Sequence, residues 1–164
     1  MKIIIPDLTP KVLEFCRSLN PSAEPVYVPC RPHELSRPRL CFINTLIQIH
    51  KHGGRPCFGW AVGQIEDLFL EASFHAIWRS PRGQLIDVSY REFDEILFLP
   101  DDSLLPNSRP IPSRHWLLTD NSKVELLVSW LELYEKSMLD TLESYLSRLD
   151  NSSVFLNQQL EKLK

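Results

Sequence analysis

The sequence FHAIWRSPRGQLIDVS, residues 74–89, contains two runs of strand-forming residues on either side of a turn sequence. The runs at 74–79 and 84–89 are rich in apolar, β-branched and aromatic side chains, and Ser-Pro-Arg-Gly at 80–83 is typical of a tight turn. The stretch therefore predicts a β-hairpin. A turn this short places His75 opposite Asp87 or Val88, with neighbouring side chains on one face of the sheet.

A predicted helix at residues 41–52 lies upstream of this hairpin. It has an apolar face and ends at Gly53-Gly54, a common way to terminate a helix. Cys41 opens it, and the free backbone amides and dipole at a helix N-terminus favour a thiolate there. The same amides can receive an oxyanion. Asn44, one turn further on, is predicted to flank the same opening.

Cys41, His75 and Asp87 together have the order and the local contexts of a nucleophile, its base and the group that orients the base. The interpretation is that Cys41 attacks an amide carbonyl, His75 moves the proton and Asp87 fixes the imidazole tautomer. Water as acceptor would give a peptidase or deamidase, and an amine would give an acyltransferase. This chemistry requires no cofactor and no metal.

The rest of the chain supplies the surrounding elements. The pattern predicts a first strand at 3–5, a helix that begins at Pro10 with Thr9 as its N-cap, and a proline-rich connector at 21–38 with a short strand at 26–28. Further short strands are predicted at 58–63, 68–70 and 96–99, and a loop at 100–114.

A long amphipathic helix is predicted from Asn121 onward, with a break at Asn151-Ser152-Ser153. Its apolar stripe consists of Leu127, Leu131, Tyr134, Met138, Leu142, Tyr145 and Leu149. We expect one domain over residues 1–164, with an α+β core at 1–119 and a helical extension at 120–164. In that core the nucleophile helix packs on an antiparallel sheet of five strands.

Composition excludes some classes of function. Formal net charge is −3, from 18 basic and 21 acidic residues, so nucleic acid and anionic membranes are not expected partners. No apolar run approaches the roughly 18 residues that span a bilayer, and the isoleucine run at 3–5 is too short for a signal peptide. A cytoplasmic protein with four free cysteines is the expectation.

The site motifs resemble those of transglutaminase-like members of the papain-like cysteine protease superfamily over residues 39–100. Their His-Ala-Trp is similar to His75-Ala76-Ile77-Trp78, and their Asp-Pro-Thr is similar to Asp87-Val88-Ser89. Arylamine N-acetyltransferases share the order, their Asp-Val-Gly resembles Asp87-Val88, and they carry an Asn three residues after the Cys. The chain departs from both families, with Phe42 where transglutaminases have Trp and no Arg-Gly-Gly before Cys41. The resemblance implies a papain-like fold and a Cys-His-Asp triad acting on a peptide or protein amide.

Four alternatives stay open. The chain could be a non-catalytic module that keeps the fold and binds a protein. It could transfer acetyl groups in the manner of the arylamine enzymes. Its C-terminal helices could pair with a protein partner or a second copy rather than cover their own sheet. A zinc site is the fourth, with fragments of a ligand pattern at Cys30, His33, His50, His52 and Cys57.

Overall fold

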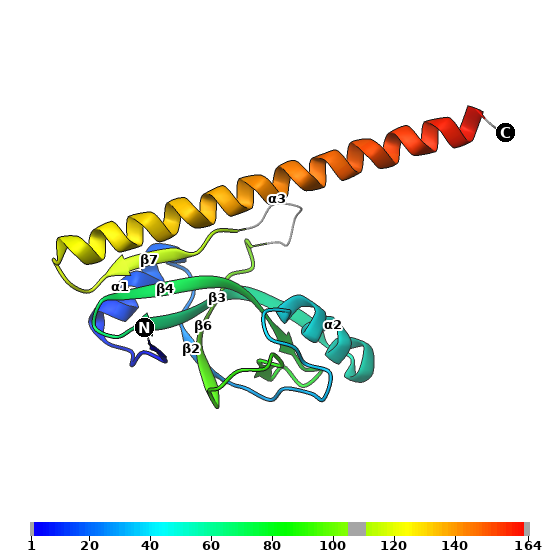
Figure 1. Ribbon diagram of the computed structural model, residues 1–164. Helices are drawn as coiled ribbons and strands as arrows, with labels where there is room; N and C mark the ends of the chain where they lie inside the picture. Colours follow the sequence, from blue (N-terminus) through cyan, green and yellow to red (C-terminus); the bar gives the residue numbers. More distant parts are fainter. Residues whose placement is uncertain (1, 105–110, 163–164) are drawn as a thin grey trace.

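The computed structural model describes residues 2–104 and 111–162, and the side chains of the last helix as far as residue 144. Over this part of the chain the fold is mixed α+β, with three helices and seven strands in one open antiparallel sheet (Figure 1). The predicted α+β class and antiparallel sheet are confirmed, with more strands than the five expected. The elements are β1 Ile3–Ile4, α1 Pro10–Leu19, β2 Val26–Pro29, α2 Cys41–His52, β3 Arg55–Ile65, β4 Phe69–Arg79, β5 Leu85–Ile86, β6 Glu95–Pro100, β7 Arg114–Leu117 and α3 Ser122–Lys162.

The sheet follows the order β2-β6-β3-β4-β5, with β1 added to β3 and β7 added to β4. Its centre is the β3–β4 hairpin, in which every residue from Arg55 to Ile65 pairs with one from Phe69 to Arg79. The runs predicted at 68–70 and 74–79 are thus one strand. The polar side chains of Glu71 and Ser73 interrupted the apolar pattern, but they lie on one face of the strand and leave its backbone pairing intact.

α1 begins where the sequence predicted. Thr9 is its N-cap and accepts a hydrogen bond from the Val12 N–H at 3.3 Å, and Pro10 occupies the first turn. The helix buries Val12, Phe15 and Cys16 in the main core cluster, where Trp60 and Leu97 contribute from the sheet. Burial of this apolar face fixes α1 against β3 and its neighbours.

The hairpin predicted around His75 and Asp87 is shorter than expected, and its predicted register is wrong. β5 pairs only Leu85 and Ile86 with the end of β4, and His75 is opposite Gly59 of β3. The chain then leaves β4, because the backbone after β2 binds Asp87 instead. Asp87 N–H donates to the Pro29 carbonyl at 3.0 Å, and the Asp87 carbonyl accepts from the Arg31 N–H at 2.8 Å.

α3 runs from Ser122 to Lys162 without interruption, so the predicted break at Asn151-Ser152-Ser153 is wrong. Serine and asparagine cost a helix only about 0.5 kcal/mol each, which is too little to stop it. The first turns pack on the sheet, where Val124 and Val128 join Ile65 and Phe69 in a buried cluster. Beyond that contact the helix continues past the edge of the sheet (Figure 1). The strand β7, which pairs with residues 69–72, was not predicted.

Candidate active site

The N-terminus of α2 fills an open edge of the sheet. On the side of β4 away from β3, β7 pairs with residues 69–72 and β5 pairs with residues 78–79, so no described strand pairs with the stretch 73–77 there. Cys41 and Thr45 occupy the gap. The Thr45 hydroxyl donates to the Ala76 carbonyl at 3.3 Å, and the Ala76 amide lowers the pKa of the Cys41 thiol. The unpaired backbone of β4 therefore sets the position of the thiol.

Aromatic packing holds α2 in this place. The ring of Phe42 contacts Phe74 and Phe58, with ring centroids 5.5 and 5.9 Å apart. The residue next to Cys41 is thus anchored on the two central strands. Leu40 is the N-cap, and its side chain makes no hydrogen bond to the helix. The first backbone amides of α2 therefore have no side-chain acceptor at the N-cap.

Asn44 does not flank the opening as predicted. It is 1% exposed, and its amide binds the backbone of Arg37 twice, with Oδ1 accepting from the N–H at 3.0 Å and Nδ2 donating to the carbonyl at 2.8 Å. The Asn44 carbonyl in turn accepts from His33 Nε2 at 3.1 Å. Asn44 therefore clamps the loop that leads into Cys41, where Arg39 takes a left-handed conformation with φ of 63°.

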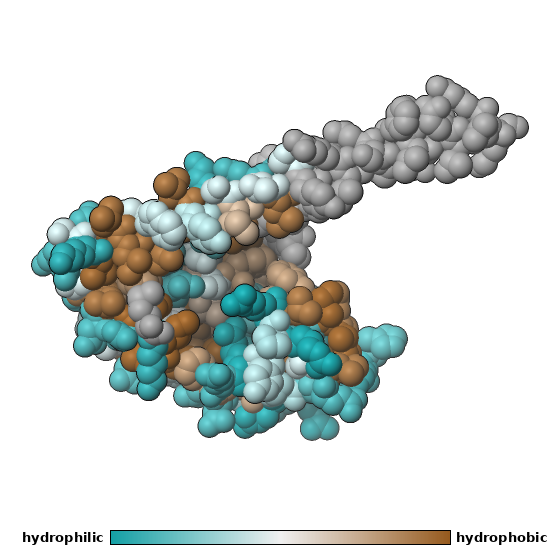
Figure 2. Space-filling view, viewed as in Figure 1, coloured by the Kyte–Doolittle hydropathy of each residue, from teal (hydrophilic) through white to brown (hydrophobic). Residues whose placement is uncertain are grey.

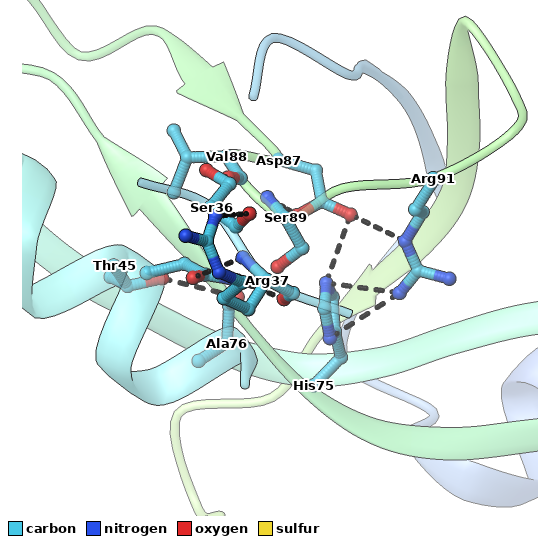
Figure 3. A network of polar contacts seen from close by, with 10 residues as sticks. Ser36, Arg37, Thr45, His75, Ala76, Asp87, Val88, Ser89 and Arg91 are labelled. Atoms are coloured by element: carbon cyan, nitrogen blue, oxygen red, sulfur yellow. Dashed lines mark hydrogen bonds and ion pairs between the residues drawn. The ribbon is translucent and has the colours of Figure 1, made fainter. Parts of the chain in front are cut away.

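His75 and Asp87 meet through their side chains although their backbones do not pair. His75 Nε2 lies 3.0 Å from Asp87 Oδ2, and the two residues are 5% and 0% exposed (Figure 3). Asp87 Oδ1 accepts from the Ser89 N–H at 2.9 Å. With Nε2 held by the carboxylate, Nδ1 is the nitrogen left for the thiol of Cys41, which lines the same cleft as His75.

Arg91 is a member of this site that the sequence reasoning missed. Its Nε donates to Asp87 Oδ2 at 2.7 Å, and its Nη2 lies 3.2 Å from Nε2 and 3.4 Å from Nδ1 of His75 (Figure 3). The lone-pair directions of two ring nitrogens diverge, so one donor cannot align with both, and the contact with the ring is mainly electrostatic. The spacing of four residues from Asp87 was the only available signal.

The electrostatics of the site favour a thiolate beside an imidazolium. Burial raises the pKa of Cys41. The hydrogen bond and charge of His75, together with the amides of Ala76 and Phe42, lower it by more, so the net pKa is below the ordinary value. Burial lowers the pKa of His75, yet its hydrogen bonds to Asp87 and Cys41 raise it to a net value above the ordinary one. Burial also opposes ionisation of Asp87, and its bond to His75 and the charges of His75 and Arg91 bring that pKa down to about 2.

The other cysteines differ from Cys41. All four are free thiols, and Cys16, Cys30 and Cys57 are buried. Burial raises the pKa of Cys16 and of Cys30 to about 11. No cluster of ligands supports the zinc alternative, because no three His, Cys, Asp or Glu side chains in the described residues are grouped to hold a metal ion.

A cleft of about 410 Å³ opens over the site. It is lined by Pro38, Arg39, Cys41, Phe74, His75, Ser89, Tyr90, Arg91, Glu92 and Phe93. The thiol and the imidazole thus face a space large enough for part of a peptide or a small amide.

Comparisons with family models, with curated proteins and with solved structures found no match for this chain. None of the helices in the described residues has the length and apolar character needed to cross a membrane.

Proposed function

We propose that this chain is a cysteine-dependent enzyme that acts on an amide, with a papain-like or transglutaminase-like arrangement of Cys41, His75 and Asp87. One observation carries the proposal. A thiol at a helix N-terminus lines the same cleft as a buried imidazole, and Nε2 of that imidazole lies 3.0 Å from a buried carboxylate. Nucleophile, base and orienting group are linked in the order that acyl chemistry needs.

The first half of the reaction forms an acyl-enzyme. The Cys41 thiolate attacks the carbonyl carbon, so an S–C bond forms and the carbonyl π electrons move to oxygen, where an amide at the start of α2 donates to it. Collapse restores the C=O bond and breaks the C–N bond. The imidazolium of His75 gives its proton to the departing amine, while Asp87 keeps the ring oriented.

The second half depends on the acceptor. His75, now neutral, takes a proton from water or from an amine, whose lone pair attacks the thioester carbonyl and releases Cys41. Water gives a peptidase or deamidase, and an amine gives a transferase. The reaction requires no cofactor. Free thiols at all four cysteines fit a reducing compartment such as the cytoplasm.

The test is the pH dependence of Cys41 alkylation by iodoacetamide, followed by mass spectrometry. Buried Cys16, Cys30 and Cys57 should react slowly, and Cys41→Ser is the control for their contribution. In the wild type the midpoint should fall below the free-thiol value of about 8.5, and in His75→Ala it should rise, because the amides of Ala76 and Phe42 alone then oppose the effect of burial. His75→Gln, which keeps a polar side chain beside Asp87, checks that the change is electrostatic. Equal midpoints in wild type and variants would contradict the proposal.

A second candidate function is protein binding through α3. It carries six large apolar side chains that are 45–70% exposed, and hydrophobic residues are visible along its described part in Figure 2. Leu126, Trp130, Leu133 and Tyr134 lie on its outward face, and Met138 and Leu142 continue the stripe of Leu127 and Leu131 further along the helix. At roughly 100 Å² each they offer about 600 Å² per chain, near the ~800 Å² per partner of a standard interface. We propose that a second copy of this chain binds these exposed apolar side chains of α3. The mass in solution, measured by light scattering over a range of concentrations, tests it.

A further inference from the structure

The hydroxyl of Ser89 is buried without a hydrogen-bond partner. It is the one buried side-chain oxygen or nitrogen without a partner among the described residues, and Ser89 is only 4% exposed. A buried hydroxyl normally finds a partner, because desolvation without a hydrogen bond costs free energy. An exception of this kind therefore calls for a reason.

Ser89 belongs to the wall of the cleft above Cys41 and His75. Figure 3 shows its side chain pointing from the Asp87 segment toward the part of the site where His75 lies. Phe74 and Phe93 line the same cleft and make the wall partly apolar. A hydrogen bond made here is stronger than one made in water.

The backbone around Ser89 is fixed at several points. Its N–H donates to Asp87 Oδ1 at 2.9 Å, and the preceding Val88 carbonyl accepts from the Ser36 hydroxyl at 2.6 Å. Two residues further on, Arg91 is tied to Asp87 Oδ2. The backbone that carries the hydroxyl is thus held in place by the same contacts that orient the imidazole, as the position of a preorganised donor must be.

We propose that Ser89 is the side-chain hydrogen-bond donor for the carbonyl oxygen of the acyl group on Cys41, an inference that rests on the proposed function. When the thiolate forms the S–C bond, negative charge develops on that oxygen. Backbone amides are the donors at the start of α2, where Leu40 supplies no side-chain cap. The Ser89 O–H adds a side-chain donor to these amides and keeps its proton throughout. It gains its missing partner when the oxyanion forms.

Two reagents separate this role from a structural one. Iodoacetamide alkylates the thiolate by displacement at a saturated carbon, so no oxyanion forms. p-Nitrophenyl acetate acylates it through a tetrahedral oxyanion and releases p-nitrophenolate. Ser89→Ala should alkylate within about twofold of the wild-type rate and acylate about 100-fold more slowly, the loss that follows removal of one oxyanion donor.

Ser80→Ala is the matched control. Ser80 is also a buried serine, but its hydroxyl accepts from the Gln84 N–H at 3.1 Å in the β4–β5 turn and does not line the cleft. Ser80→Ala should melt at a lower temperature and acylate at the wild-type rate. Ser89→Ala should melt no lower than the wild type, because it removes a hydroxyl that has no partner in the free protein.

The outcomes are distinct. An ordinary thiol titration of wild-type Cys41 overturns the proposed function itself. A depressed Cys41 pKa with an acylation rate unchanged in Ser89→Ala overturns only the role of Ser89, and so does an equal loss of alkylation and acylation. The wild type could also have a depressed Cys41 pKa and release no p-nitrophenolate. That result overturns acyl transfer to Cys41 and the role of Ser89 in it, and leaves the Cys41–His75 pair in place.

Discussion

Arg91 and His75 donate to the same oxygen of Asp87. Arg91 Nε lies 2.7 Å from Oδ2 and His75 Nε2 lies 3.0 Å from it, while the remaining oxygen accepts from the Ser89 amide. Arg91 therefore has two opposing effects on His75. It holds the carboxylate that orients the ring, and its positive charge disfavours the imidazolium.

The charge of Arg91 can be tested by Arg91→Gln. Without the guanidinium, the pKa of His75 should rise, because the imidazolium loses a neighbouring cation. The free energy of unfolding should fall by about 1.5–3 kcal/mol, the value of a hydrogen bond to a charged group. The measurements are the pH profile of alkylation and urea unfolding.

Arg82→Gln is the control for that experiment, since Arg82 is an exposed arginine in the β4–β5 turn. It should leave both measurements unchanged. A fall in the pKa of His75 in Arg91→Gln would show that the carboxylate is misplaced without Arg91, and that holding Asp87 is the larger of the two effects.

Asp87 should make folding stability depend on acid pH. Its folded pKa of about 2 lies below the ordinary value of about 3.9, so the unfolded state binds more protons between these values. The stabilising contribution is complete above about pH 4 and is lost as the pH falls toward 2. From the two pKa values it amounts to about 2–3 kcal/mol.

Urea unfolding of the wild type and of Asp87→Asn at pH 5 and pH 2.5 measures this contribution. Other carboxylates titrate in both proteins, so the difference between the two is the readout. The gap in unfolding free energy should be large at pH 5 and should shrink at pH 2.5. A gap independent of pH would mean that the ionised form of Asp87 is not what stabilises the fold.

The sequence was sufficient for elements whose signals are local. The Thr9-Pro10 start of α1 and the bounds of α2 from Cys41 to Gly53 follow from capping and from apolar spacing, and both were confirmed. Proximity of His75 and Asp87 was also expected, yet for a partly wrong reason. The backbone register differs because Pro29 and Arg31, far away in the sequence, take the hydrogen bonds of Asp87.

The remaining site features depend on tertiary paths that no local pattern records. Asn44 binds a loop whose course is set by proline-rich sequence, and Arg91 reaches Asp87 from an irregular segment. The unpartnered state of Ser89 is known only once all neighbours are placed. These residues have ordinary sequence contexts, and only the folded chain shows their roles.

The loop clamp of Asn44 can be tested by Asn44→Ala. The change leaves the N–H and carbonyl of Arg37 without their partners, so the unfolding free energy should drop by about 2 kcal/mol. Alkylation of Cys41 should also slow, because the loop that enters α2 loses its fixed course. Gln48→Ala truncates an amide on the same helix and is the control. Equal effects of the two variants would mean that helix propensity, not the clamp, is responsible.

The outward face of α3 predicts self-association. Trp130 and Tyr134 stack in parallel there, with ring centroids 5.8 Å apart, and Leu133 beside them is 65% exposed. We expect the wild type to give twice the chain mass of 19.1 kDa at high concentration. Leu133→Glu should give the single-chain mass, because a charge buried in an apolar interface without a partner is costly.

Glu125→Lys changes a charge on the same helix, also at an exposed position but about 80° around the helix axis from Leu133 and on the side away from Trp130 and Tyr134. It should keep the doubled mass. Val128→Ala changes the opposite face, which packs on Ile65 and Phe69, and should lower the melting temperature without changing the mass. If the wild type has the mass of one chain at all concentrations, a second copy is not the partner of α3. A doubled mass lost equally in Glu125→Lys would mean that the contact between the two copies is not made by the face that carries Leu133.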